Sequence, residues 1–285
     1  MKVKHITVLA LAALLLVACA GTPVIDPVES ATRNKLFTLA HSSARSETNI
    51  ARNQHRNPVE TLLFFGLRDD MTVVEITPGS GAWYTEILGP MMRDNGSLYA
   101  AGYNPDSDNE GVIKSAIKYN EKMIANPELY DKIVQTVFAS DRLEPAPDGS
   151  ADMVLVFRNF HGWAGGGYHQ EAMDAVYKAL KPGGVLGLVQ HRMDEDTVLG
   201  EDEKPGDVGY IKPSLIIETA ENSGFELVAT SQINANPADT KDHPNGVWTL
   251  PPANNYRNLP EGTDTSVYTA IGESDRMTLK FVKPK

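Results

Sequence analysis

Apolar runs alternate with amphipathic segments along most of the chain, from about residue 58 to residue 233. The continuous apolar runs are typical of strands buried on both faces, and they span 71–77, 98–102, 133–139, 153–157, 185–190 and 225–233. The helical patterns between them span 83–92, 110–125, 169–180 and 213–222. Strands that alternate with helices predict an α/β fold with a Rossmann-like, doubly wound, mostly parallel sheet.

Local signals indicate where some of these helices begin and end. Residues 57–60 read Asn-Pro-Val-Glu, an N-cap residue, a proline at the first helical position and a carboxylate near the capping-box site. On the helix over 169–180, Ala172, Val176 and Ala179 share one face. The Lys-Pro-Gly-Gly sequence at 181–184 is expected to stop that helix.

The two ends of the chain depart from the alternating pattern. Residues 29–53 read as one or two polar helices with few apolar anchors, and residues from about 234 to 275 are rich in proline, asparagine and glycine before a last strand over 277–282. A loop this long is usually functional or disordered. We therefore predict a tether and helical lead-in over 19–57, and one domain over 58–285 with a long insertion at about 234–275.

The first residues have the pattern of an export signal. Lys2 and Lys4 precede an apolar run over 6–18, which is too short to span a bilayer, and the run stops at Cys19. Leu-Val-Ala-Cys at 16–19 resembles the bacterial lipobox, which implies cleavage after residue 18 and a diacylglycerol on Cys19. The alternative is an ordinary cleaved signal peptide with an incidental cysteine.

These features predict the compartment and exclude some partners. The lipobox resemblance implies a periplasmic protein that is lipid-anchored to the membrane, and Ala20 in place of aspartate implies the outer membrane. Cys19 is the only cysteine, so no disulfide forms within the chain. Removing residues 1–18 leaves 24 basic against 37 acidic residues, a net charge of −13, and such a surface repels nucleic acid.

The sharpest signal for chemistry is the segment over 73–82, Val-Val-Glu-Ile-Thr-Pro-Gly-Ser-Gly-Ala, which runs from a strand through a glycine turn into a helix. Glycines let the backbone approach a ligand, and a helix N-terminus offers free N–H groups. The same pattern also occurs in tight connections that bind nothing. Its neighbours in the sequence therefore decide its meaning.

With those neighbours, the chain resembles the class I S-adenosylmethionine (SAM) dependent methyltransferases. Glu75, Gly79 and Gly81 match the first motif of that family, Ser140-Asp141 follows the third strand, Asp152 opens the fourth, and residues 180–186 form a helix-to-strand passage frequent in it. More narrowly, the chain is similar to predicted exported bacterial methyltransferases of unknown substrate, through residues 64–67, 158–161 and 242–245. The resemblance implies SAM as cofactor and a small-molecule or envelope acceptor. It implies a cofactor site made of these residues: Glu75, Thr77, Gly79, Gly81, Asn104 and Asp141.

Two positions depart from the family pattern. Thr77 replaces the first glycine of the turn, and Gly102-Tyr103-Asn104 stands where an acid usually holds the ribose hydroxyls. Asn104 can accept one hydrogen bond there, and Asp106 reaches the same place if the loop bends.

His161 and Asn159, just past the fourth strand, are the candidate catalytic residues. A histidine titrates near neutrality, so His161 is a candidate base for the acceptor's proton; the alternative is a loop histidine with local hydrogen bonds. Three aromatic residues near this edge either wall a pocket or belong to the core: Trp83, Tyr84 and Trp163. The spacing of the histidines fits no standard metal site, so we expect none.

The sequence thus favours a SAM-dependent methyltransferase of the cell envelope. The alternative is a catalytically inactive lipoprotein of the same fold that binds a ligand or envelope partner through the insertion. A nicotinamide oxidoreductase is less favoured because Tyr84 stands at the third glycine position after Gly81. A serine hydrolase is disfavoured because the Gly-x-Ser-x-Gly elbow is absent.

Overall fold

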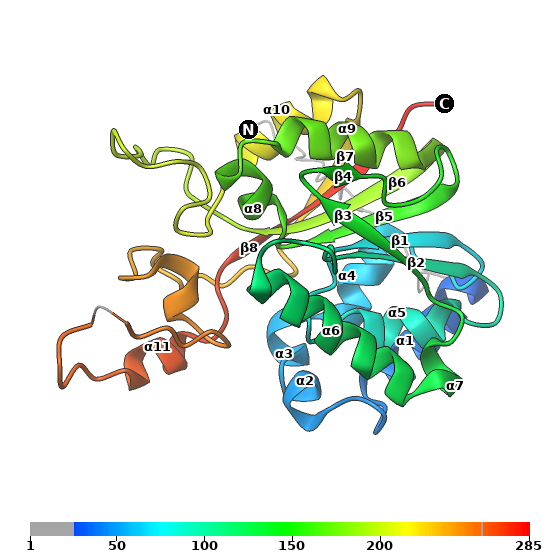
Figure 1. Ribbon diagram of the computed structural model, residues 1–285, viewed down its shortest axis with the longest axis horizontal. Coiled ribbons are helices and arrows are strands. Elements are labelled where there is room, and N and C mark those ends of the chain that lie inside the picture. Colours follow the sequence, from blue (N-terminus) through cyan, green and yellow to red (C-terminus); the bar gives the residue numbers. More distant parts are fainter. Residues whose placement is uncertain (1–25, 258) are drawn as a thin grey trace, which may run out of the picture.

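The computed structural model describes residues 26–257 and 259–285 (Figure 1). Residues 1–18, predicted as a signal peptide, and Cys19 therefore lie outside the described residues. The helices are α1 (Pro27–Ala40), α2 (Glu47–Ala51), α3 (Asn53–Arg56), α4 (Pro58–Phe65), α5 (Thr85–Met92), α6 (Glu110–Ala125), α7 (Pro127–Tyr130), α8 (Phe160–Gly165), α9 (His169–Ala179), α10 (Pro213–Asn222), the short 3-10 helix η1 (Gly246–Thr249) and α11 (Ser266–Ile271). The strands are β1 (Thr72–Ile76), β2 (Ser97–Gly102), β3 (Val134–Ala139), β4 (Arg142–Leu143), β5 (Ala151–Phe157), β6 (Leu180–His191), β7 (Glu226–Ser231) and β8 (Arg276–Val282).

The strands form one sheet in the order β4-β3-β2-β1-β5-β6-β8-β7. The five central strands, β3, β2, β1, β5 and β6, run parallel to one another. At one edge β4 is antiparallel to β3, and at the other β8 is antiparallel to both β6 and β7. The predicted doubly wound, mostly parallel α/β fold is confirmed. The sheet order reverses at β1, because β2 lies on one side of it and β5 on the other.

Helices cover both faces of the sheet (Figure 1). Successive side chains of a strand point to opposite faces; Val73 of β1 packs with residues of α1, α4 and α5, whereas Val74 and Ile76 pack with residues of α9 and α10. These alternating contacts explain why β1 reads as a continuous apolar run. No helix within the described ranges combines the length and the apolar character needed to cross a membrane.

The lead-in helices are part of the same folded unit. Leu36 and Ala40 of α1 are fully buried in the core formed with α4 and α5. The segment after α1 is fixed by Arg45, whose Nε donates to the buried carboxylate of Glu86 at 3.1 Å. The lead-in therefore packs on the domain, as its helical pattern with a few apolar anchors predicts.

The long insertion is irregular but well anchored. The buried carboxylate of Asp239 accepts hydrogen bonds from the Tyr210 hydroxyl at 2.9 Å, the His243 ring at 2.8 Å and the Asp275 backbone N–H at 2.7 Å. These bonds tie both ends of the insertion to the domain. The insertion consequently forms one wall of the site described below.

Three local predictions were wrong in detail. Asn57 precedes α4 with φ 39°, and its side chain donates to the Ile233 carbonyl at 2.7 Å instead of capping the helix. Helix α5 begins at Thr85 and not at residue 83, since Ala82 holds the left-handed φ of 51° within the turn. Residues 181–184 belong to β6, where a register shift against β5 accommodates them.

Candidate functional site

Two adjoining cavities lie beyond the carboxyl ends of β1 and β5, where the sheet order reverses. This is where open α/β sheets bind ligands. The first, of about 260 Å³, has one wall from residues 247–253, 273 and 274, and we call it the insertion cavity. The second, of about 660 Å³, is lined by loops 104–109 and 138–141, and we call it the loop cavity. Both are lined by the same five residues: Thr77, Tyr103, Arg158, Asn159 and His161.

The glycine turn after β1 leaves open space beside its backbone. Gly79 has φ 71°, and a Cβ on Gly79 or Gly81 meets no atom within 4 Å. Thr77 itself adopts φ 43°, and its N–H donates to the Ala101 carbonyl at 2.8 Å. A β-branched residue with positive φ is a strained outlier. Thr77 therefore keeps the left-handed conformation that a glycine would adopt at this position.

Glu75 lies below the turn and lines the insertion cavity. Its carboxyl group is buried and accepts a hydrogen bond from the Thr85 hydroxyl at 2.6 Å. Burial raises the pKa of Glu75 to about 8. The group is therefore protonated at neutral pH, and a cationic ligand group beside it would stabilise its ionised form.

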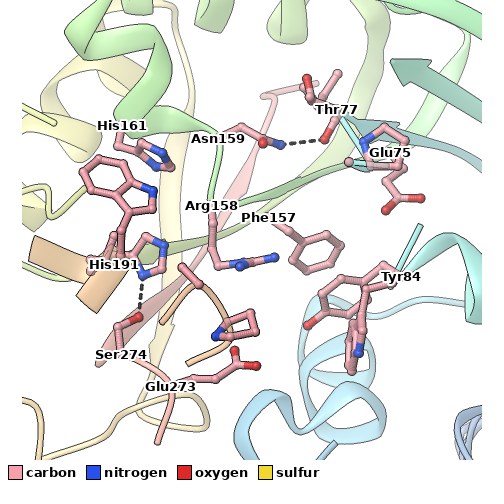
Figure 2. A pocket seen from close by; sticks show the side chains of 18 of the residues that line it. Glu75, Thr77, Tyr84, Phe157, Arg158, Asn159, His161, His191, Glu273 and Ser274 are labelled. Atoms are coloured by element: carbon pink, nitrogen blue, oxygen red, sulfur yellow. Dashed lines mark hydrogen bonds between the residues drawn. The ribbon is translucent and has the colours of Figure 1, made fainter. Parts of the chain in front are cut away.

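Asn159 joins the ends of β1 and β5. Its side-chain amide donates to the Ile76 carbonyl at 2.6 Å (Figure 2). Its Oδ1 makes no hydrogen bond within the described part of the chain, and the residue lines both cavities. The predicted catalytic residue Asn159 thus also positions the two strand ends, and it offers one free acceptor to a ligand.

His161 lines both cavities as predicted, but its hydrogen bond favours a different role from that of a base. The Gln190 amide nitrogen donates to the Gly209 carbonyl at 3.0 Å, and this bond fixes the orientation of the Gln190 amide. The same nitrogen lies 3.3 Å from His161 Nδ1. Nδ1 is then an acceptor, so in the neutral ring Nε2 carries the proton. Burial and the nearby Arg158 lower the pKa of His161 to about 4. His161 is thus suited to donate a hydrogen bond from Nε2.

The loop cavity holds the polar residues expected near a ribose and an adenine. Asn104 is buried, and its Oδ1 accepts from the Asp106 N–H at 3.0 Å. This turn brings Asp106 to the cavity, so a carboxylate is present although the chain lacks an acid directly after β2. Asp141 lines the same cavity from the end of β3, and Trp163 adds an apolar surface.

The structure thus brings seven of the predicted site residues to the two cavities: Glu75, Thr77, Gly79, Asn104, Asp141, Asn159 and His161. Gly81 lines neither of them, and its carbonyl accepts from Lys122 Nζ at 2.8 Å. Asp152 lies at the opposite end of the sheet, where it accepts from the Thr72 N–H at 2.8 Å. Those two residues shape the turn and the sheet. The predicted lipidation residue, Cys19, lies outside the described residues.

A buried ionic cluster beside the insertion cavity is not predictable from the sequence pattern. Glu273 from the insertion accepts from Arg52 at 2.7 Å, Arg56 at 2.8 Å and Arg276 at 3.1 Å. Burial opposes ionisation of Glu273, but the three arginines hold its pKa at about 2. No local pattern reveals this cluster, because Arg56 and Glu273 are 217 positions apart.

Two aromatic residues between the cluster and the turn also form part of the cavity wall. Tyr84 and Phe157 stack with ring centroids 3.5 Å apart and an interplanar angle of 6°. Both are buried, and both line the insertion cavity. Tyr84 is therefore a core residue and a cavity wall at once, as is Trp83.

Comparisons with known proteins support the fold. The sequence matches no family model and no curated protein. Solved structures do match: a SAM dependent methyltransferase from Aquifex aeolicus has a TM-score of 0.52 and 14% identity, over 88% of this chain and 98% of that one. A putative sarcosine dimethylglycine methyltransferase from Galdieria sulphuraria gives 0.51 and 12%, over 90% and 98%. The [4+2]-cyclase SpnF gives 0.54 and 14%, over 90% and 93%. The chain has the fold of SAM-dependent methyltransferases.

Proposed function

We propose that this protein is a SAM-dependent methyltransferase that acts on a small acceptor. One observation carries the proposal: two cavities of different character meet at Thr77, Asn159 and His161. A transferase needs such a junction, since it must hold a donor and an acceptor in line. The open glycine turn lies beside that junction.

The residues present fit SAM. The space beside Gly79 admits a ligand against the backbone, and Glu75 can ionise to pair with an ammonium group. Asp106 and Asn104 line the loop cavity and can serve as polar partners for ribose hydroxyls, and Trp163 offers a face to a base. When bound, SAM would supply an electrophilic methyl group for transfer to a nucleophilic atom of the acceptor; the products would be the methylated acceptor, the demethylated thioether and a proton.

The chain's own residues then align the acceptor and exclude water. Asn159 fixes the two strand ends and presents Oδ1 at the junction, where it can accept a hydrogen bond from the acceptor. His161 can donate a hydrogen bond from Nε2 to the bound acceptor. Residues 247–253 of the insertion cover the insertion cavity. Positioning of this kind needs no covalent intermediate.

A place in the cell envelope is part of the proposal. It is supported by the export pattern of residues 1–18 and by the lipobox-like segment that ends at Cys19. An enzyme there would depend on SAM supplied from the cytoplasm. The acidic surface agrees with an acceptor other than nucleic acid.

Calorimetry on the full chain in mild detergent tests the proposal. We expect SAM and its demethylated product to bind, and the variant Gly79→Val to lose that binding because its side chain fills the open space. Gly149→Val is the matched control, because Gly149 also has positive φ, 60°, and open space around it but lies in neither cavity. Absence of heat and of thermal stabilisation with either ligand at about millimolar concentration contradicts the proposal.

The second candidate is a binding protein that has lost methyl transfer. It is favoured by Thr77 in place of the family's glycine and by Asn104, whose oxygen already accepts from the Asp106 N–H. SpnF is named as a cyclase, and this likeness agrees with the general rule that a fold serves several functions. Binding of SAM without release of its demethylated product in the presence of candidate acceptors would favour this candidate.

A further inference from the structure

Arg158 is a charged residue without a protein partner at the centre of the insertion cavity. Its backbone N–H donates to the Val189 carbonyl at 2.7 Å, while its guanidinium forms no hydrogen bond or ion pair with any residue in the described part of the chain. Figure 2 shows this side chain ending beside the Phe157 ring, between Thr77 and Glu273 in this view. The nearby carboxylate of Glu273 is already engaged by three other arginines. Arg158 is therefore free to bind a ligand.

The backbone also indicates a functional constraint at this residue. Arg158 has φ 62°, the left-handed region that few residues other than glycine adopt. Conformational strain of this kind persists where the surroundings impose it, and it is concentrated at functional sites. Here the strained turn places a guanidinium in the cavity directly after β5.

The surrounding charges leave an excess of positive charge. Arg52, Arg56, Arg158 and Arg276 lie around Glu273, so four guanidinium groups face one ionised carboxylate. Nη1 and Nη2 of Arg56 are buried without a hydrogen-bond partner within the described residues, and this guanidinium lies 4.8 Å from the centre of the Trp83 ring, a wall of the cavity. The other titratable residues that line the cavity do not supply a negative charge.

Burial raises the pKa of the lining residues Tyr84 and Tyr103, so both stay uncharged. The remaining residues are two histidines and a buried carboxyl group. Burial and Arg158 lower the pKa of His161 to about 4, and burial with neighbouring positive groups lowers that of His191 as well. Burial raises the pKa of Glu75 to about 8. All three are uncharged at neutral pH, so the positive charge is not compensated within the cavity.

We propose that the insertion cavity binds the methyl acceptor through an oxyanion, a carboxylate or a phosphate, held by Arg158. The planar guanidinium matches both groups with paired N–H donors. The stacked rings of Tyr84 and Phe157 and the Trp248 side chain line the rest of the cavity, which suits a flat, apolar body. The volume of about 260 Å³, part of which lies beside Glu75 and Gly79, restricts the acceptor to a small molecule. The assignment of this ligand as acceptor rests on the proposed function.

Calorimetry on the full chain in mild detergent tests the site with benzoate, phenyl phosphate and the neutral benzamide. The wild type should bind at least one anion about tenfold more tightly than benzamide. Arg158→Gln should weaken anion binding about tenfold or more, and Arg158→Lys should weaken it less, because the charge remains. Arg68→Gln is the control, since Arg68 is exposed, pairs with Asp70 and lies outside the cavity. The stronger of the two anions identifies the oxyanion.

Binding of the demethylated cofactor separates the acceptor site from the cofactor site. If Arg158 holds the acceptor, Arg158→Gln should weaken binding of the demethylated cofactor much less than it weakens binding of the anion. An equal loss of anion and cofactor affinity would overturn the assignment, since Arg158 would then hold the cofactor's carboxylate. Equal anion binding by wild type and variant, or no preference for an anion over benzamide, also overturns it.

Two further outcomes remain informative. If Arg158→Gln does not fold, Arg158→Gly removes the guanidinium and suits the left-handed φ, so the same comparison applies. If the anion binds through Arg158 but neither SAM nor its product binds, the oxyanion site stands and the transferase proposal fails. Failure of the transferase proposal and failure of the anion-site proposal therefore give different results in these experiments.

Discussion

The side-chain amide of Asn159 donates to the backbone carbonyl of Ile76 at 2.6 Å, and this bond joins the ends of the two strands that flank the reversal of the sheet. Ile76 precedes the strained Thr77, and Asn159 follows the strained Arg158. One hydrogen bond thus connects the turn after β1 to the turn after β5. It sets the relative position of the two turns.

We expect Asn159→Ala to destabilise the protein by about 1–2 kcal/mol, because the Ile76 carbonyl loses its partner. The midpoint of thermal unfolding should fall by about 2–4 °C per kcal/mol. The affinity for SAM should fall as well, since the turn after β1 is no longer fixed. Asn95→Ala, which removes an exposed hydrogen bond to Asp69, serves as control. An unchanged midpoint and affinity would show that the bond contributes nothing.

Much of the fold follows from local pattern. Continuous apolar runs and amphipathic segments predict the strands and helices, and the ends of parallel strands bring Glu75, Gly79, Asn104 and Asp141 to one edge of the sheet. Such residues are predictable because each lies a few positions from a strand end. Their common edge then follows from the architecture.

The rest of the site depends on contacts between distant segments. The ion pair of Arg56 with Glu273 joins residues that are 217 positions apart in the sequence. The contact between His161 and Gln190 spans 29 positions. A charged residue in a polar helix reads as solvated unless its partner is known, so the buried role of Arg56 is invisible to the sequence pattern. The protonation of His161 is equally invisible, since a tertiary contact sets it.

The lipid anchor is tested by Cys19→Ser. Because Cys19 is the only thiol in the chain, the variant should lose incorporation of labelled palmitate and should remain uncleaved or be released as a soluble product. Ala20→Ser is the control and should keep the label. Equal incorporation into wild type and Cys19→Ser would refute lipidation at this residue.

His161 should be neutral with its proton on Nε2 at pH 7, because its pKa is lowered to about 4 and Gln190 donates to Nδ1. Two-dimensional ¹H–¹⁵N NMR of the imidazole nitrogens detects this tautomer directly. His161→Ala should lower turnover about tenfold with little change in SAM affinity, and His161→Gln, which keeps a donor, should lower it less.

The control for His161 is His41→Ala, because His41 is exposed and bonds only the local Phe37 carbonyl. The pH–rate profile of the wild type should contain no break near the ordinary histidine pKa. The contradicting result is a break at that pH that disappears in His161→Gln. Such a break would restore His161 as a general base with an ordinary pKa.

Glu75 makes both stability and cofactor binding depend on pH. Its folded-state pKa is raised to about 8, so the folded state binds one proton more than the unfolded state between about pH 4.5 and pH 8. The stabilising contribution of the protonated group is complete below the unfolded pKa and is lost as pH rises through about 8. Glu75→Gln should therefore be more stable than wild type by roughly 4–5 kcal/mol near pH 8.5, and about equal near pH 4.5.

A bound ammonium group reverses this preference, because it favours the ionised carboxylate. At about pH 6.5, binding of SAM to the wild type should release close to one proton from Glu75, which calorimetry in two buffers of different ionisation enthalpy measures. Glu75→Gln should release none and should bind SAM more weakly, whereas the exposed Glu60→Gln should match the wild type in both respects. Equal proton release by wild type and Glu75→Gln would show that Glu75 does not face the cation, and the cofactor would then have to bind elsewhere along the strand ends.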